Sequence, residues 1–346
     1  MSSSRPYPPG TTVNDRYELT GKVGTDGSVY RAHDRNLDKH VAIKFLDPKN
    51  GRAQPWDEAQ RLEHLRSRFL LDVINADVVL NSDIRFIVTP IHVQGDLESE
   101  ARPNGLASHD VVRYMQQVAS GIDRIHGAGM VHRDIKPANV LLDGDNVVVS
   151  DLEFCEILDA DGRATRNGSY CTVAPETAAD AGYCSVLSDV YSLGATAFYL
   201  FSGEYPVDHR LPRSEQQRLI ICGCIRQLRV VAPHTSRAVA TVIRKAMHLD
   251  PALRFQSAES FANALIQAAR GSRNWRRVEH ADHIHCLEGA ATKTRGTVTV
   301  CAVRSTNKIE VSARLRSGRR MSGITDVVTT DRDLAKVLQR LVNAVN

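Results

Sequence analysis

One loop constrains the fold of this chain more than any other stretch. Residues 130–142 read Met-Val-His-Arg-Asp-Ile-Lys-Pro-Ala-Asn-Val-Leu-Leu. The loop holds a carboxylate at Asp134, a cation at Lys136 and an amide at Asn139. Residues 140–142 then form an apolar run that is typical of a buried strand. The alternative is a surface loop whose polar side chains bond their own backbone, but the length of the pattern and the following strand argue against it.

The three polar residue types suit phosphoryl transfer. That reaction requires a protein to orient a hydroxyl, to hold metal ions and to neutralise charge on phosphate oxygens. Asp134 can accept the hydroxyl proton, and Lys136 can lie against the γ-phosphate. Asn139 can offer a hard oxygen ligand to magnesium. We therefore predict that these three residues are catalytic, with Asn139 also a metal ligand.

The loop resembles the catalytic loop His-Arg-Asp-x-Lys-Pro-x-Asn of eukaryotic-type serine/threonine protein kinases. The resemblance implies an α+β, two-lobed protein-kinase fold, with an N-terminal lobe of β-sheet plus one helix and a mostly helical C-terminal lobe. It also implies ATP with Mg²⁺ or Mn²⁺, a protein substrate and autophosphorylation. In that family Lys136 is the residue that favours serine and threonine over tyrosine.

An upstream stretch is similar to the glycine-rich loop Gly-x-Gly-x-x-Gly-x-Val that covers the phosphates of ATP. Gly24, Gly27 and Val29 match its second and third glycines and its valine. Lys22 stands where the first glycine belongs. Taken alone, the stretch is equally typical of an ordinary hairpin turn.

The next strand, residues 41–44, reads Val-Ala-Ile-Lys. In the family its lysine, here Lys44, bonds the α- and β-phosphates and is held by a carboxylate from a nearby helix. We predict Glu58 as that carboxylate, because the apolar residues Leu62 and Leu65 follow it at helical spacing. Glu63 is the competing candidate. The resemblance assigns further nucleotide contacts to Ala42, Thr89, His92 and Leu141, with Thr89 as a small gatekeeper and the His92 amide as the donor to adenine.

Residues 150–153, Ser-Asp-Leu-Glu, occupy the position of the metal-binding motif Asp-Phe-Gly. Asp151 retains the carboxylate that would hold magnesium. Glu153 replaces glycine, which tolerates backbone angles that glutamate does not, and a second carboxylate there could compete for the metal. Glu153 and Lys22 therefore favour an alternative function, a pseudokinase that acts as a binding or scaffold protein.

Residues 151–176 correspond to the activation segment, which ends in Ala-Pro-Glu. Thr165 and Ser169 are candidate phosphorylation sites, and Arg133 is placed to bind a phosphate there. Further along, the resemblance predicts that Asp189 bonds the catalytic-loop backbone and that Arg254 forms a salt bridge with Glu176. A third class of function, a small-molecule kinase, shares this fold. The Ala-Pro-Glu motif and Arg254 favour a protein substrate instead. The resemblance covers about residues 17–270.

The domain organisation follows from these boundaries. Residues 1–14 are rich in Ser and Pro, which predicts a flexible tail. We expect residues 15–271 to form the kinase domain and residues 272–346 to form a small basic α+β domain. In that last part, residues 297–304 and 308–315 alternate like a β-hairpin, and residues 333–345 have helical spacing with Thr-Thr-Asp as a predicted cap.

The C-terminal part carries the basic surplus of the chain. Residues 273–346 hold 14 Lys and Arg and 7 Asp and Glu, a net charge of +7, whereas the whole chain has +4. The basic run Arg314, Arg316, Arg319 and Arg320 predicts either a solvated positive face or a docking surface for an acidic protein or another anionic partner. Nucleic acid is not expected, because the motifs that stack bases are absent.

Seven cysteines without paired Cys-x-x-Cys spacing predict reduced thiols. A metal site at His280, His283, His285 and Cys286 is an alternative that lacks a second ligand group. The longest nearly uncharged run, residues 191–203, is too short to span a bilayer, and the N-terminus lacks the apolar core of a signal peptide. We therefore expect a cytoplasmic protein without a transmembrane segment.

Overall fold

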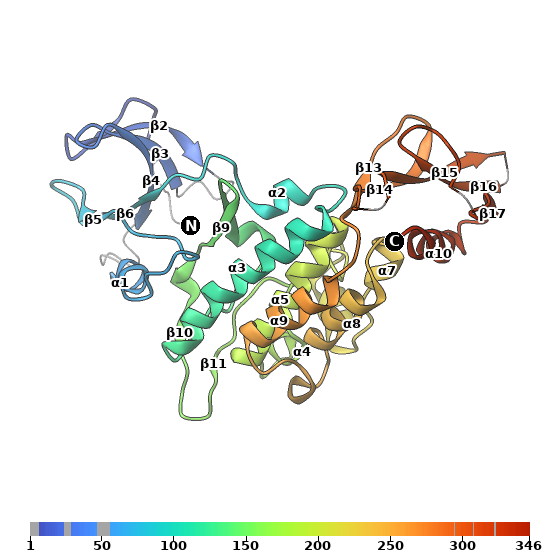
Figure 1. The fold of residues 1–346 in the computed structure, drawn as a ribbon. Helices are drawn as coiled ribbons and strands as arrows, with labels where there is room; N and C mark the ends of the chain where they lie inside the picture. Colours follow the sequence, from blue (N-terminus) through green and yellow to red (C-terminus); the bar gives the residue numbers. More distant parts are fainter. Residues whose placement is uncertain (1–6, 24–28, 47–55, 294, 307, 322) are drawn as a thin grey trace. The chain divides into compact units, whose positions relative to one another are not determined.

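The computed structural model describes residues 7–23, 29–46, 56–293, 295–306, 308–321 and 323–346 (Figure 1). They belong to two compact units. The first unit comprises residues 1–94 and 142–153, and the second comprises residues 95–141 and 154–346. Gly24 and Gly27, the predicted glycines of the phosphate-binding loop, lie outside the described residues.

The first unit is organised by a six-stranded antiparallel sheet. Its strands lie in the order β1 (Thr12–Val13), β2 (Tyr17–Val23), β3 (Val29–Asp34), β4 (Lys39–Leu46), β6 (Arg85–Pro90) and β5 (Asn75–Val78). Side chains of alternating strand positions form a core that contains Tyr17, Leu19, Ile43 and Phe86. Strand β1 falls within the range predicted as a tail, yet it pairs with β2, and Val13 is buried.

Two further segments complete this unit. Helix α1 (Asp57–His64) buries Ala59 and Leu62. The chain returns to this unit at Leu142, within β8 (Val140–Asp143), and continues through β9 (Asn146–Val149). The Leu71 amide donates to the Val149 carbonyl at 2.9 Å and so ties β9 to the rest of the unit. Strand β9 therefore delivers residues 150–153 to the same unit as β4 and α1.

The second unit contains a helical region. Its helices are α2 (Leu97–Ala101), α3 (Ser108–Gly127), α4 (Pro175–Ala178), α5 (Val186–Ser202), α6 (Arg213–Ile221), α7 (Leu228–Val231), α8 (Arg237–Ala246) and α9 (Ala258–Ala269) (Figure 1). Helix α3 is amphipathic and buries Val111, Met115, Val118, Ala119, Ile122 and Ile125 on one face. Helix α5 is buried along almost its whole length and starts with a capping box between Ser185 and Ser188.

A small sheet with one packed helix ends the second unit. The sheet runs in chain order through β13 (Trp275–Val278), β14 (His283–Gly289), β15 (Val298–Ser305), β16 (Lys308–Leu315) and β17 (Val327–Thr329), followed by helix α10 (Leu334–Val345). The core between sheet and helix contains Trp275, Leu287, Val311 and Leu341. The predicted hairpin and helix are thus confirmed. The predicted cap is wrong, because the Asp333 side chain accepts from Lys336 at 3.1 Å and caps no backbone amide.

This small sheet is fixed to the helical region by polar contacts. The Asn274 side chain accepts from the His109 amide at 2.9 Å, and the Ser108 hydroxyl donates to the Trp275 carbonyl at 3.1 Å. From helix α10, the side-chain nitrogen of Gln339 donates to the Arg229 carbonyl at 2.6 Å. None of the described helices combines the length and apolar character required to cross a bilayer.

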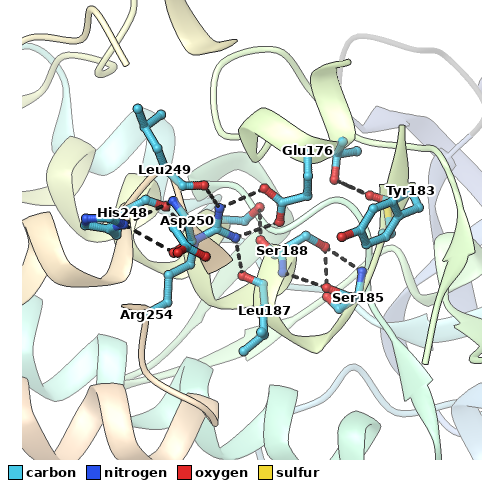
Figure 2. A network of polar contacts seen from close by, with 12 residues as sticks. Glu176, Tyr183, Ser185, Leu187, Ser188, His248, Leu249, Asp250 and Arg254 are labelled. Atoms are coloured by element: carbon cyan, nitrogen blue, oxygen red, sulfur yellow. Dashed lines mark hydrogen bonds and ion pairs between the residues drawn. The ribbon is translucent and has the colours of Figure 1, made fainter. Parts of the chain in front are cut away.

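A buried ion pair joins distant parts of the helical region (Figure 2). Both terminal nitrogens of Arg254 donate to the Glu176 carboxylate, at 2.6 and 2.7 Å. The guanidinium also donates to the carbonyls of His248, Leu187 and Leu249. The Arg254 side chain is fully buried, and these five contacts compensate the cost of burying its charge. The predicted salt bridge is confirmed.

Replacing Arg254 with alanine leaves the Glu176 carboxylate buried without its partner. We expect Arg254→Ala to lower the free energy of unfolding by about 3–5 kcal/mol, measured as a shift of the urea midpoint. Arg218→Ala is the matched control, because Arg218 pairs with Glu215 at the surface and such pairs contribute little. Equal midpoints for the two variants would contradict the structural role of Arg254.

Candidate active site

Strand β4 and helix α1 bring the predicted lysine and carboxylate together in the first unit. The Lys44 Nζ lies 3.1 Å from Glu58 Oε1 and 2.8 Å from Glu153 Oε2. Glu58 is therefore the helix carboxylate that contacts the lysine. The competing Glu63 lies 3.7 Å from Arg66 and is largely exposed. The second contact, with Glu153, was not predicted.

The two carboxylates determine the protonation of the lysine. Burial opposes the charged form of Lys44, but the charges of Glu58 and Glu153 outweigh it and raise the lysine pKa above its usual value. Burial raises the pKa of Glu58, the Lys44 charge opposes this, and the Glu153 charge adds to it. Lys44 therefore stays cationic, and Glu153 makes the ionised form of Glu58 harder to maintain.

Glu153 fits the backbone at the position where the motif has glycine. It lies in the 3₁₀ turn η2 (Leu152–Phe154), a conformation that any L-residue adopts. The positive φ lies instead at Asp151, at 59°. The concern about backbone angles at Glu153 is thus wrong. The replacement of glycine by Glu153 instead adds a carboxylate beside Lys44. The Arg61 guanidinium also holds the turn, because it donates to the Glu153 carbonyl at 3.2 Å.

Three further predicted nucleotide residues of this unit lie on neighbouring strands, and His92 follows β6. Val29 is the register partner of Lys44, and Ala42 is the partner of Thr89. His92 is almost fully buried, with its Nδ1 3.7 Å from the Asp143 carboxylate. The sheet thus places Val29, Ala42 and Thr89 around Lys44.

The second unit contains the loop of residues 130–142. Asp134 is buried and accepts from Lys136 Nζ at 2.8 Å through Oδ2. Asn139 donates through its amide nitrogen to the Asp134 carbonyl at 2.9 Å and to Oδ2 at 3.2 Å. Asp134 therefore contacts both of the other predicted catalytic side chains of this loop. Leu141, in strand β8, is half-buried and bridges to Asp96.

A serine hydroxyl from the activation segment completes this arrangement. Ser169 Oγ donates to Asp134 Oδ1 at 2.7 Å and accepts from Lys136 Nζ at 3.0 Å. Burial raises the pKa of Asp134, but Lys136 and the Ser169 hydrogen bond outweigh it and hold the pKa below the ordinary value of 3.8. A hydroxyl therefore lies between an ionised carboxylate and a lysine. Ser169 was predicted only as a phosphorylation site, and its contacts with Asp134 and Lys136 were not expected.

Asp189 of helix α5 holds the backbone of this loop. Its buried carboxylate accepts from the His132 amide at 2.8 Å and from the Arg133 amide at 3.1 Å, as predicted. It also lies 2.9 Å from His126 Nε2. Arg133 has a φ of 71°, an unfavourable angle for a residue with a Cβ. The two bonds to Asp189 compensate for that angle and fix the direction of Asp134.

The Arg133 side chain reaches the activation segment. Its Nη1 donates to the Thr165 hydroxyl at 2.6 Å and to the Thr165 carbonyl at 3.0 Å. The same guanidinium forms an ion pair with Glu156, whose carboxylate also accepts from the Thr165 hydroxyl. Thr165 is exposed. Thr165 thus lies against Arg133, as predicted. The Glu156 carboxylate beside them was not predicted.

A family model described as a protein kinase domain matches residues 17–266. This chain therefore belongs to the protein kinase family, and the predicted two-lobed fold class is confirmed. It is 33% identical over 204 residues to CBL-interacting protein kinase 3 of Oryza sativa subsp. japonica, covering 56% of this chain and 46% of that protein.

A bacterial and a second plant kinase are similar as well. Serine/threonine-protein kinase PrkC of Bacillus subtilis (strain 168) is 30% identical over 273 residues, covering 72% of this chain and 40% of that protein. CBL-interacting serine/threonine-protein kinase 21 of Arabidopsis thaliana is 30% identical over 212 residues, covering 59% of this chain and 51% of that protein. The chain thus spans about half or less of the length of these curated relatives.

The contact between Glu153 and Lys44 predicts weakened nucleotide binding. We expect Glu153→Gln to tighten binding of Mg-ATP about threefold, because a partly exposed ion pair contributes about 0.5–1 kcal/mol. Titration calorimetry measures the change. Glu63→Gln, on the exposed face of α1, is the control and should bind like the parent chain. Weaker binding by Glu153→Gln would show that Glu153 assists the nucleotide instead.

The contact between Lys136 and Asp134 predicts a pH effect. Because the pKa of Asp134 is depressed, its carboxylate stays ionised even at pH values somewhat below its ordinary pKa. It takes up a proton only as the pH falls through the lower pKa of the folded protein. Lys136→Met removes the lowering charge and leaves the burial, so the acidic limb of kcat against pH should move to higher pH. Lys136→Arg retains the charge and should keep the limb of the parent chain. Identical limbs for all three proteins would contradict this assignment.

Proposed function

We propose that this protein is a serine/threonine protein kinase that transfers the γ-phosphoryl group of ATP to protein hydroxyls and phosphorylates itself. The observation that carries the proposal is the Ser169 hydroxyl, held between Asp134 at 2.7 Å and Lys136 at 3.0 Å. This is the environment that a substrate hydroxyl requires, because a base faces its proton and a cation faces the incoming phosphate. The serine/threonine kinase names of the relatives support the same substrate class.

The residues present fit ATP and a divalent metal. Magnesium prefers carboxylate and carbonyl oxygens, and the Asp151 carboxylate and the side-chain oxygen of Asn139 would supply them. The side-chain nitrogen of Asn139 donates to Asp134, and its side-chain oxygen is of the ligand type that magnesium prefers. When bound, Mg²⁺ or Mn²⁺ would neutralise charge on the phosphate oxygens. Lys44 would bind the nucleotide phosphates while Glu58 holds its ammonium group.

The other residues predicted for the nucleotide site would contact ATP. Gly24, Gly27 and Val29 would cover the phosphates, and Ala42, Thr89 and Leu141 would line the adenine site. The His92 amide would donate to the adenine ring. Asp134 would accept the proton of the substrate hydroxyl, and Lys136 would stabilise the transferring group.

Thr165 is the activation-segment residue that we propose for phosphorylation. It is exposed and already bonded to Arg133. A phosphate on Thr165 would repel the Glu156 carboxylate and take its place on the Arg133 guanidinium, because a dianion binds arginine more strongly than a carboxylate does. That exchange would link the phosphate to the loop that holds Asp134.

A second candidate function is a binding or scaffold protein that retains the fold. The observation that favours it is the Glu153 carboxylate at 2.8 Å from Lys44, on the cation that the phosphates would need. The positive charge of the C-terminal region supports an acidic protein as its partner. Arg314 and Arg320 are paired with Asp326 at 2.7 and 2.9 Å. Arg316 and Arg319 are therefore the members of the basic run that we propose for contacts with that partner. We place the protein in the cytoplasm, as the sequence predicts.

Transfer of labelled γ-phosphate tests the enzyme. We expect the purified chain with Mg²⁺ or Mn²⁺ to label itself and a generic basic protein, and Asp134→Asn and Asp151→Ala to abolish both. Peptide mapping should find the label on Thr165. Label that persists in Asp134→Asn would refute the assigned base. ATP binding without any transfer, even in the Glu153→Gly variant, would favour the scaffold function.

A further inference from the structure

Four potential metal ligands meet on one face of the C-terminal sheet. They are His280, His283, Cys286 and Cys301, and their ligand atoms all lie within 4.8 Å of one another. His283 and Cys286 belong to β14, Cys301 belongs to β15, and His280 lies in the turn before β14. The group is distinct from the candidate active site. It supplies the second cysteine that the sequence-based metal alternative lacked, and it does not include His285.

The register of the sheet explains why these residues converge. Cys286 and Cys301 are direct partners across β14 and β15. In a regular strand His283 and Cys286 would face opposite sides, because side chains alternate with a period of two. A β-bulge between His283 and His285 adds one residue and turns His283 to the face that carries both cysteines. The bulge therefore places a third ligand on that face.

A tight turn adds the fourth ligand. The His283 amide donates to the His280 carbonyl at 3.2 Å, and Asp282 between them has a φ of 65°. This turn stacks the two imidazoles edge to face, with ring centroids 5.4 Å apart. His283 Nδ1 lies 3.0 Å from Cys286 Sγ, and His280 Nδ1 lies 3.4 Å from Cys301 Sγ. Each imidazole thus presents the same nitrogen to one sulfur.

We propose that His280, His283, Cys286 and Cys301 form a structural zinc site. Two sulfur and two nitrogen ligands in a tetrahedral arrangement are typical of Zn²⁺. Zinc bonds to sulfur and nitrogen place such ligands about 3.6 Å apart, close to the two observed sulfur–nitrogen distances. Two thiolates and two neutral imidazoles balance the charge of the ion. That balance suits buried cysteines, which are 1% and 8% exposed, because no net charge is buried.

The zinc form requires reduced cysteines. In the structure the Cys286 and Cys301 sulfurs are joined as a disulfide, a pairing that the expectation of reduced thiols did not include. A phosphine reductant converts the disulfide to two thiols by supplying two electrons and becoming its oxide, with two protons taken from water. Zinc then binds as both thiols lose their protons to solvent. The disulfide and the zinc site are alternative crosslinks of the same two strands.

The contacts of the turn show what the ion would hold. Glu279, next to His280, accepts from the Asn104 side chain at 3.0 Å. Asn104 lies in the segment between α2 and α3. Zinc binding would therefore order the turn that joins the small sheet to the helical region.

Metal analysis of the full chain tests the site. We expect the chain, purified with a phosphine reductant and ZnCl₂ and then desalted, to retain one zinc ion per chain by mass spectrometry. Cys286→Ser with Cys301→Ser, and separately His280→Gln with His283→Gln, should lose it. The matched control is Cys222→Ser with Cys224→Ser, because that pair is also joined as a disulfide but no histidine belongs to it among the described metal-ligand groups. This control should retain the zinc.

Cobalt substitution gives a readout that does not depend on the folding of a variant. Co²⁺ added to the reduced parent chain should produce the visible bands of a tetrahedral ion and a thiolate charge-transfer band of two-sulfur intensity, and Zn²⁺ should abolish both. Absence of retained zinc together with an octahedral Co²⁺ spectrum would overturn the proposal. So would zinc that persists in the Cys286 and Cys301 double variant.

Discussion

The buried carboxylate of Asp189 is the constraint on which the catalytic loop depends. Backbone amides that face the interior need acceptors, and Asp189 supplies one to His132 and one to Arg133. Arg133 can then hold a positive φ, which directs Asp134 toward Lys136 and the Arg133 side chain toward Thr165. One side chain from α5 thus determines both the direction of the proposed base and the position of the proposed phosphate receptor.

The activation segment uses these two positions in different ways. Ser169 is half-buried and its hydroxyl is engaged by Asp134 and Lys136, whereas Thr165 is exposed and its hydroxyl is engaged by Arg133 and Glu156. Phosphate on Ser169 would bring a dianion against the Asp134 carboxylate, which is unfavourable. Phosphate on Thr165 would meet an arginine instead. The surroundings therefore distinguish two residues that the sequence treated as equal candidates.

Sequence motifs predicted the pairs that depend on fixed residue types. Lys44 with Glu58, Asp189 with the loop backbone and Arg254 with Glu176 were all expected and are all present. The contacts of Glu153 and Glu156 were not expected, because a motif specifies a position and not the direction in which a replacement side chain points. Two members of the basic run are paired within the chain, which was likewise not expected. Asp326 neutralises Arg314 and Arg320 from a separate segment, so a count of charges overstated the positive surface. The predicted domain boundaries at residues 15–271 and 272–346 stay predictions.

The histidine and cysteine group shows a physical limit of reading strands by their period. The predicted group rested on nearness along the chain, so it included His285 and lacked Cys301. Alternation alone would place His283 and His285 on one face of β14 and Cys286 on the other. One inserted residue at the bulge reverses the face of His283 and leaves His285 with Ala302 as its partner. Cys301 enters through the pairing of two strands that are separated by a long connection, which no local spacing reveals. A metal site of this kind depends on register, and register is set by the packing of the whole sheet on α10.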